Sequence, residues 1–131
     1  MDLKLRENKK RNKTRFTDSL GYATDGLKYA FKYEIKFLIY PIVTIIVVAT
    51  AFILNISAVE WCIIIFSLAL VMAFELVNSA IEACIDLISP KYHVLAKVAK
   101  DCAAAAVLVI VIVTMIIGVV IFIPKLISYI V

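Results

Sequence analysis

A chain of 131 residues is long enough for one domain, but 64% of these residues are hydrophobic and the mean hydropathy is +1.03. Soluble proteins contain about 45–50% apolar residues, and a body of this size cannot hide so much apolar surface from water. An ordinary soluble domain is therefore excluded, and an integral membrane protein is predicted. The formal net charge of +4 does not indicate nucleic-acid binding, because ten of the fourteen Lys and Arg residues precede residue 37, beside the first long apolar run.

The cysteines and the polar N-terminal region exclude two further classes. Cys62, Cys84 and Cys102 show no CxxC spacing and lie in or beside apolar runs. They are expected to be reduced, small hydrophobic residues and not disulfide partners or zinc ligands. The chain is polar where a secretory signal would place its apolar core, so no signal peptide is expected.

The first predicted element is an amphipathic helix that follows a charged segment. Residues 1–14 form a basic stretch with too little apolar content to fold alone, and we expect them to be flexible. Between about residues 15 and 35, apolar residues repeat at intervals of four and three, which predicts a helix that lies at the membrane interface. The repeating residues are Phe16, Leu20, Ala23, Leu27 and Ala30.

Three membrane-spanning helices are predicted after this surface helix, within one domain over residues 15–131. They are expected at about residues 37–54, 60–88 and 100–123. Pro41 lies near the start of the first span, where its missing amide donor is least disruptive. Ser89 and Pro90 are expected to stop the second span, and Pro124 to end the third.

The distribution of basic residues predicts the topology. Ten lie before the first span and none between the first and second. Lys91, Lys97 and Lys100 lie between the second and third spans, and only Lys125 follows. The positive-inside rule then places the N-terminus in the cytoplasm and the C-terminus outside, in a multi-pass protein of the bacterial cytoplasmic membrane.

The second span carries an unusual group of polar residues. Glu75, Ser79, Glu82 and Asp86 fall on one stripe of a helix, with Asn78 at its edge. Charged side chains at membrane depth are costly, so they usually face protein or water and indicate a functional site. The predicted topology places this stripe at the cytoplasmic end of the span.

Further polar residues converge on the same membrane face. Glu34 lies at the cytoplasmic entry to the first span, and Lys100 and Asp101 at the entry to the third. There is no GxGxxG, GxxxxGK[ST] or HExxH motif and no Ser/His/Asp set. Carboxylates and an amide suit a hard cation such as Mg²⁺ that shares its oxygen ligands with nucleotide phosphates. Phosphoryl transfer requires little more of a protein than positioning, charge neutralisation and a base.

The residues at this point resemble a known family. Glu75-Leu-Val-Asn-Ser-Ala-Ile-Glu-Ala-Cys-Ile-Asp86, followed by Tyr92-His93 and Ala99-Lys-Asp101, is similar to the prokaryotic diacylglycerol kinases. That family also contains the undecaprenol kinases of Gram-positive bacteria. The pattern E-x-x-N-[ST]-A-I-E-x-x-x-D with a later A-K-D is long and fixed in spacing, and the resemblance extends over nearly all of residues 15–110. The basic N-terminal stretch and Ser19-Leu-Gly-Tyr-Ala23 are closer to the undecaprenol kinase branch.

The resemblance implies a homotrimeric membrane kinase with three spans and a surface helix in each subunit. It implies transfer of the γ-phosphoryl of MgATP to the hydroxyl of undecaprenol, or alternatively of diacylglycerol, at the cytoplasmic face. Glu75 matches the catalytic base, Glu34 and Glu82 match the metal ligands, and Asn78 and Asp86 support the site. The positions that match nucleotide-binding residues are Arg15, Tyr22, Glu34, Glu82, Lys91, Tyr92, His93, Lys100 and Asp101.

The chain departs from the family pattern at two places. Leu38 stands where the family often has a basic residue shortly after the first metal-binding Glu. Ala103–Ala106 follow Lys100 and Asp101 where Gly or Ser is common. These departures concern lipid preference and helix packing, and neither involves the base or the metal ligands.

Two non-enzymatic readings compete with the kinase. In the first, the protein is a small membrane assembly or ion-handling subunit whose acidic stripe forms a proton or cation path; a transporter is the second. An ion path does not require Arg15, Glu34 or the Lys100-Asp101 pair, and the internal repeat expected of a transporter is not visible at this length. Taken alone, Asn78 could join helices, and Lys100 and Asp101 could anchor a helix start. The acceptor is not fixed by the sequence, because both lipids present one hydroxyl beneath apolar tails.

Overall fold

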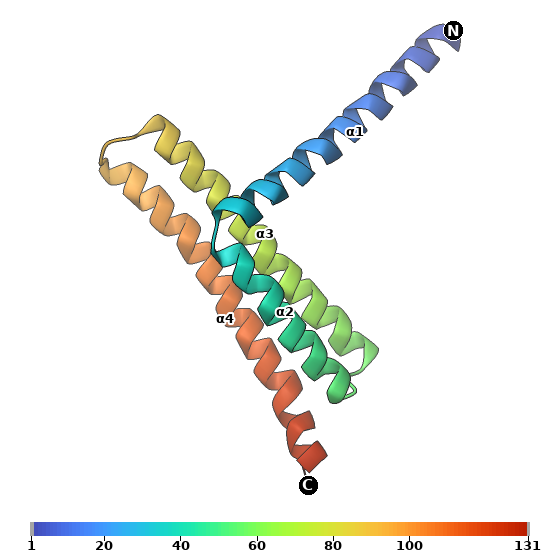
Figure 1. Ribbon diagram of the computed structural model, residues 1–131, viewed down its shortest axis with the longest axis vertical. Coiled ribbons are helices and arrows are strands. Elements are labelled where there is room, and N and C mark those ends of the chain that lie inside the picture. Colours follow the sequence, from blue (N-terminus) through green and yellow to red (C-terminus); the bar gives the residue numbers. More distant parts are fainter. Residues whose placement is uncertain (1, 131) are drawn as a thin grey trace. The chain divides into compact units, whose positions relative to one another are not determined.

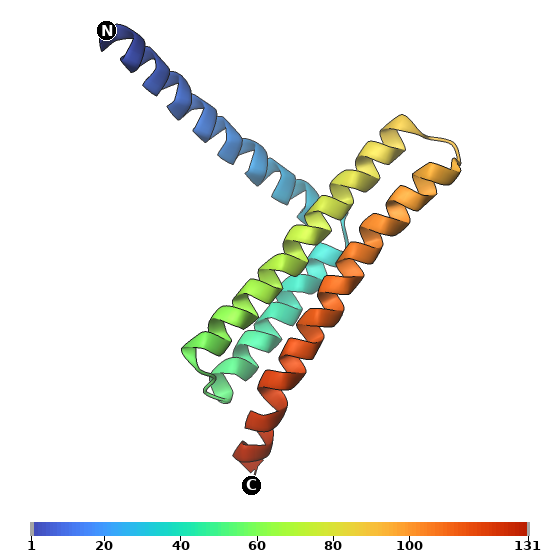
Figure 2. The same cartoon turned by 180° about the vertical axis from the view of Figure 1, so that it is seen from behind.

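The structure, a computed structural model, describes the backbone of residues 2–130 and the side chains of residues 15–130. Its elements in chain order are the helices α1 (Asp2–Tyr33), α2 (Lys36–Ile53), α3 (Ala58–Ile88) and α4 (Val94–Ile130), shown in Figures 1 and 2. The chain divides into two compact parts, Met1–Leu38 and Ile39–Val131. The first part holds α1, and the second holds nearly all of the three apolar helices.

The first part is a single long helix and the turn that follows it. α1 begins earlier than predicted, because the Lys, Arg, Glu and Leu residues before position 15 are all good helix formers. The Tyr29 and Tyr33 rings, one turn apart, lie 4.8 Å apart between centroids. The Glu34 N–H donates to the Ala30 carbonyl at 2.9 Å and closes the last turn. The expected flexibility of residues 1–14 stays a prediction, although the backbone of residues 2–14 is helical.

Three helices are long and apolar enough to cross a membrane, namely α2, α3 and α4. Within the described residues, this confirms the prediction of three apolar helices that could cross a membrane, preceded by an N-terminal helix. Ser57 caps α3: its Oγ accepts from the Glu60 N–H, and its own N–H donates to the Glu60 carboxylate at 2.6 Å. Together these bonds form a capping box, which fixes the start of the helix. The far end stops where the sequence predicts, and the Ser89 N–H donates to the Ile85 carbonyl at 2.8 Å.

The apolar core of the second part lies around the α2–α3 turn. Asn55 adopts a positive φ of 47°, a conformation that Asn tolerates better than most residues. The turn brings Ile56 back against Ala51 of α2, and both pack with Ile64 of α3 and Ile121 of α4. The three apolar helices therefore meet at the end of α3 that lies far from Glu75, Glu82 and Asp86.

The prediction that Pro124 ends the last helix is wrong. α4 begins at Val94, before the expected start at residue 100, and continues through Pro124 to Ile130. A proline removes one backbone donor, but membrane helices tolerate this because neighbouring groups and local adjustment satisfy the freed carbonyl. No glycine follows Pro124 to favour a helix end.

α3 packs mainly against α4, its partner in a helical hairpin that Figures 1 and 2 show from opposite sides. The buried residues of α3 are Ile64, Ser67, Val71, Glu75 and Asn78. Their spacing of three and four places them on one helix face. This face changes from apolar to polar along its length, and the polar end approaches the α3–α4 loop.

Candidate active site

The acidic face of α3 is most buried at Glu75 and Asn78. Glu75 is 5% exposed and Asn78 is 2% exposed. The Asn78 Nδ2 donates to the Glu82 Oε1 at 3.1 Å, one turn further along the same helix. Asn78 is thus more central to the buried face than predicted, and the bond found for its amide lies within α3 and does not join two helices. The arrangement holds the Glu82 carboxylate about 10 Å along the helix from Glu75, at 1.5 Å per residue.

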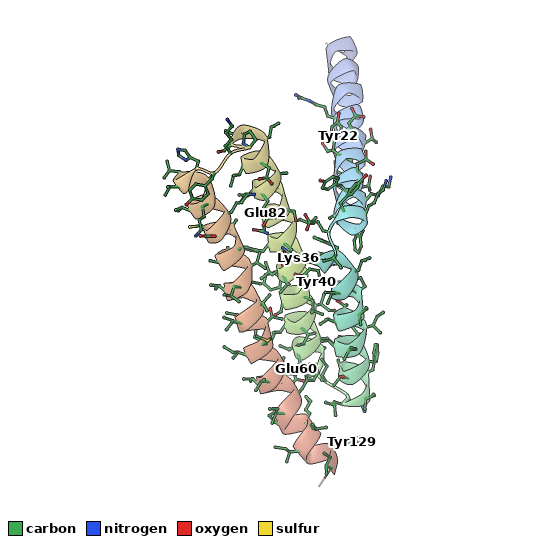
Figure 3. The ribbon with its side chains drawn as sticks, turned by 60° about the vertical axis from the view of Figure 1, so that its left-hand side comes forward. Tyr22, Lys36, Tyr40, Glu60, Glu82 and Tyr129 are labelled. Carbon is green, nitrogen blue, oxygen red and sulfur yellow. The ribbon has the colours of Figure 1, made fainter. Side chains whose placement is uncertain are left out.

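Glu75 is held by a residue that the sequence did not single out. The Tyr40 hydroxyl, from α2, donates to the Glu75 Oε1 at 2.6 Å. Figure 3 shows Tyr40 on α2, with Glu82 and Glu60 towards opposite ends of α3. A distance of 2.5–2.7 Å is typical of a hydroxyl that donates to a charged carboxylate. The contact therefore supplies a polar partner to an acid that lies among apolar helix surfaces.

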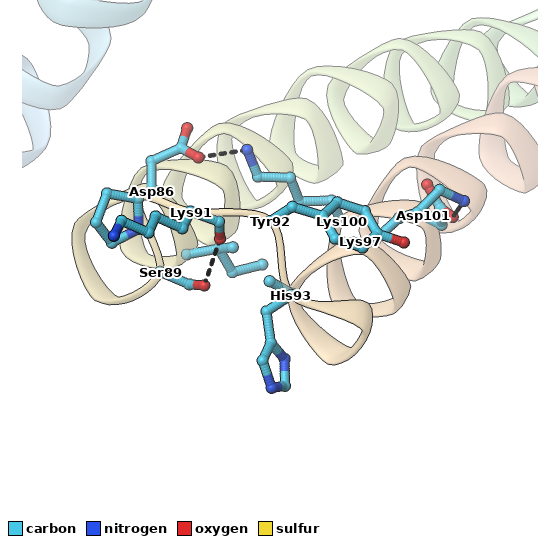
Figure 4. Close-up of a pocket in the computed structure, with 11 residues that line it drawn as sticks. Asp86, Ser89, Lys91, Tyr92, His93, Lys97, Lys100 and Asp101 are labelled. Carbon is cyan, nitrogen blue, oxygen red and sulfur yellow. Dashed lines mark hydrogen bonds and ion pairs between the residues drawn. The ribbon is translucent and has the colours of Figure 1, made fainter.

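A second feature is a cavity of about 420 Å³ at the α3–α4 loop, here called the loop cavity and shown in Figure 4. Its volume falls within the usual range for small-molecule sites, about 300–1,000 Å³. Three lysines, two aspartates and a histidine give it a basic lining. The residues that line it are Ile85, Asp86, Ser89, Pro90, Lys91, Tyr92, His93, Ala96, Lys97, Lys100 and Asp101.

Ion pairs organise the polar side of the loop cavity. The Lys100 Nζ lies 2.5 Å from the Asp86 Oδ1 and joins α4 to α3. The Lys97 Nζ lies 2.9 Å from the Asp101 Oδ2, one turn away on α4. No ion pair is found for Lys91 among residues 15–130. Of the three lysines in this lining, Lys91 is thus the one whose ammonium group is most available to an anionic ligand.

The loop itself is held by side chains that bond to the backbone. The Ser89 hydroxyl donates to the Lys91 carbonyl at 3.0 Å. The Leu95 N–H donates to the His93 Nδ1 at 3.2 Å, so His93 occupies the position of a helix cap at the start of α4. Because Nδ1 accepts a hydrogen bond, a neutral His93 carries its proton on Nε2, which leaves that nitrogen as a donor.

The structure brings most of the predicted site residues to one end of the second part. Asn78 contacts Glu82, and Asp86 contacts Lys100. The predicted site residues that line the loop cavity are Asp86, Lys91, Tyr92, His93, Lys100 and Asp101. Arg15, Tyr22 and Glu34 belong to the first part of the chain. There, Arg15 and Tyr22 are exposed on α1, and their spacing of seven residues places them on one helix face.

Sequence reasoning missed two residues of this region, Tyr40 and Lys97. Tyr40 sits in an apolar run, and its contact with Glu75 spans 35 positions in the sequence. Lys97 was considered only as a basic loop residue, although its four-residue spacing to Asp101 is a usual signal for a helical ion pair.

Nothing in the described residues gathers three or more His, Cys, Asp or Glu side chains closely enough to hold a metal ion. Mg²⁺ usually keeps several waters and binds one or two carboxylates together with substrate phosphates. The pair of Asn78 and Glu82 offers oxygen atoms of this kind, and the buried Asn78 Oδ1 has no hydrogen-bond partner among residues 15–130.

The fold and site define a small polytopic helical membrane protein with acids and a basic cavity at one end of its apolar helices. A sequence model of the prokaryotic diacylglycerol kinase family matches residues 21–122. The undecaprenol kinase of Bacillus subtilis is 39% identical over 112 residues, which cover 86% of this chain and 91% of that protein.

Two diacylglycerol kinases are similarly close. That of Escherichia coli K12 is 39% identical over 103 residues, 79% of this chain and 84% of that protein. That of Synechocystis is 39% identical over 111 residues, 84% of this chain and 63% of that protein. The chain belongs to the prokaryotic diacylglycerol kinase family.

This membership confirms the resemblance read from the acidic motif. The protein is a membrane-located lipid kinase, and its family implies the use of ATP. The ion-handling and transporter readings are therefore set aside in favour of the enzyme.

Proposed function

We propose that this protein transfers the γ-phosphoryl group of MgATP to the hydroxyl of undecaprenol, with diacylglycerol as the alternative acceptor. The observation that carries the proposal is the polarity of α3, which buries Glu75 among the spans and leads through Asn78 and Glu82 to the loop cavity. The similarity to an undecaprenol kinase over 91% of that relative favours the prenyl alcohol. The motif Ser19-Leu-Gly-Tyr-Ala23 favours the same branch.

Glu75 acts as the base in this proposal. Its carboxylate accepts the proton of the lipid hydroxyl while the hydroxyl oxygen forms a bond to the γ-phosphorus. The bond between that phosphorus and the oxygen it shares with the β-phosphate breaks, and ADP leaves. Glu75 lies deeper along α3 than Glu82 by about two turns, so the acceptor reaches it from the lipid side while nucleotide approaches from the loop.

Glu82 and Glu34 are the proposed ligands of Mg²⁺. Asn78 supports Glu82 as a metal ligand, because its amide donates the 3.1 Å hydrogen bond that orients the Glu82 carboxylate. When bound, the metal would neutralise charge on the phosphates. Asp86 is proposed as a supporting residue that holds Lys100 in place.

The loop cavity is the proposed nucleotide site. Lys91 and Lys100 supply positive charge for the phosphates, and His93 offers its Nε2–H as a donor. Tyr92 is 80% exposed and presents an aromatic face for the base. Asp101 is a further proposed nucleotide-binding residue in this cavity. Arg15 and Tyr22 of α1 are proposed to contact the same nucleotide, as the family resemblance implies.

The proposed active form is a homotrimer in the bacterial cytoplasmic membrane. The N-terminus and the α3–α4 loop face the cytoplasm, where ATP is found, and the C-terminus faces outside. Many large apolar side chains on the three spans are exposed in a single chain, which suits contact with lipid or with further copies of the protein. Native mass spectrometry of the detergent-solubilised protein tests the subunit number.

The experiment that tests the function is a phosphotransfer assay on the purified full-length protein with MgATP and each lipid. Initial rates should be higher with undecaprenol than with diacylglycerol. The Glu75→Gln variant keeps the size of the side chain but cannot act as a base, so we expect transfer to fall by roughly 10²-fold or more.

The matched control is Glu60→Gln, a change of the same kind at the opposite end of α3. We expect this variant to keep transfer activity. Wild-type protein that phosphorylates neither lipid would contradict the proposal, and so would Glu75→Gln protein with normal rates.

A further inference from the structure

Tyr40 is the link between Glu75 and the apolar interior of the spans. Its hydroxyl donates to the Glu75 Oε1 at 2.6 Å. The same residue lines a second cavity, of about 270 Å³, here called the span cavity. The lining of the span cavity comes from all three apolar helices: Ile39, Tyr40, Val43, Thr44, Leu68, Val71, Met72, Val111, Thr114 and Met115.

The span cavity leads towards Glu75 along α3. Val71 and Met72, which line it, lie one turn before Glu75 on the same helix. The lining is almost entirely apolar apart from two threonines and the tyrosine. A lipid whose chain entered here would therefore meet its first strongly polar groups at Tyr40 and Glu75.

We propose that Tyr40 is a positioning residue for this kinase, which fixes the Glu75 carboxylate at the head of the span cavity for the acceptor hydroxyl. This inference rests on the proposed role of Glu75 as the base. A glutamate side chain has several rotatable bonds, and a base must be held within about 0.5 Å of its productive position. A short hydrogen bond from a rigid aromatic side chain on another helix contributes to that positioning.

The chemistry of the donor also matters. A phenol has an ordinary pKa of about 10, so its hydroxyl donates a hydrogen bond but keeps its own proton. Tyr40 can thus orient Glu75 without neutralising it.

A purely structural tie between α2 and α3 is the competing explanation, and steady-state kinetics separate the two. The Tyr40→Phe variant keeps the ring and removes only the hydroxyl. We expect kcat for lipid phosphorylation to fall by roughly tenfold or more, as for the loss of one hydrogen bond to a charged group. The KM for ATP should stay at the wild-type value, because the loop cavity is untouched.

The control is Tyr129→Phe, which removes a hydroxyl from an exposed tyrosine at the far end of α4. This variant should match the wild type in kcat and thermal unfolding. If Tyr40→Phe protein has the wild-type kcat, the positioning role is overturned, whether or not its unfolding temperature falls.

Infrared difference spectra of protein with carbon-13-labelled glutamate test the contact without turnover. The carboxyl band of Glu75 is identified by its loss in Glu75→Gln and should shift in Tyr40→Phe. If the wild type phosphorylates no lipid, the proposed function fails and the spectra decide on Tyr40 alone. A shifted band then supports the proposal that the Tyr40 hydroxyl fixes the Glu75 carboxylate, and an unchanged band overturns it.

Discussion

Asn78 combines deep burial with an acceptor oxygen, Oδ1, for which residues 15–130 provide no hydrogen-bond partner. A buried polar atom without a partner costs about 1–3 kcal/mol of stability. A residue kept only for stability would not carry this cost, whereas a residue that orients Glu82 for catalysis can. The Asn78→Leu variant should therefore be more stable than the wild type by about 1 kcal/mol and should lose most of its phosphotransfer activity. Denaturant titration in detergent and the lipid assay measure the two effects.

Ser67 provides the control for this prediction. It lies on the same buried face of α3 at 5% exposure, but its hydroxyl is satisfied by the Ile63 carbonyl at 2.8 Å. Ser67→Ala should leave activity unchanged and should give no gain in stability. An Asn78→Leu protein that is less stable and fully active would show that Asn78 is a structural residue.

At the residue scale, the sequence predicted the acids better than their partners. The spacing of Glu75, Asn78 and Glu82 places them on one helix face whatever the tertiary structure, so periodicity alone could find them. The partner of Glu75 depends on how α2 packs against α3, and nothing local marks Tyr40. His93 was identified through the family motif, but its role as a cap of α4 was not, because histidine is not among the preferred capping residues.

The hairpin of α3 and α4 contains a charged pair whose contributions to stability and to function can be separated. The Lys100 and Asp86 side chains are 35% and 66% exposed, so their ion pair contributes at most about 1 kcal/mol to folding. We expect Lys100→Asp and Asp86→Lys each to abolish most transfer activity. The double variant, Asp86→Lys with Lys100→Asp, should recover the unfolding temperature but not the low KM for ATP.

The reason is that the proposed phosphate contact needs positive charge on α4 and not on α3. The KM for ATP and the thermal unfolding midpoint of all three variants test this. Full recovery of activity in the double variant would make the pair a purely structural link.

At the element scale, the end of α3 was predicted correctly because it follows from local chemistry. Ser89 and Pro90 end α3 because the proline cannot continue the helical hydrogen bonds. The same argument wrongly predicted a helix end at Pro124, because a proline inside a membrane helix is tolerated where other groups satisfy the freed carbonyl. The apolar residues after Pro124 continue the helix to Ile130.

At the scale of the whole molecule, the second part separates two kinds of environment along the axis of α3. The α2–α3 turn end is closed by apolar packing around Ala51 and Ile64. The α3–α4 loop end carries a basic cavity of about 420 Å³. A kinase that joins a lipid to a nucleotide needs such a gradient, because one substrate stays in hydrocarbon and the other in water.

The proposed topology gives a prediction for the protein in cells. A single cysteine is placed at Ser89 or at Ser128, in a background from which Cys62, Cys84 and Cys102 have been removed. Ser128 is exposed near the end of α4, and Ser89 lies in the α3–α4 loop. A membrane-impermeant maleimide should label Ser128→Cys in intact cells and Ser89→Cys only after permeabilisation, because basic loops are retained in the cytoplasm. Labelling of Ser89→Cys from outside would place the basic cavity away from cellular ATP, and the cytoplasmic reaction would then be excluded.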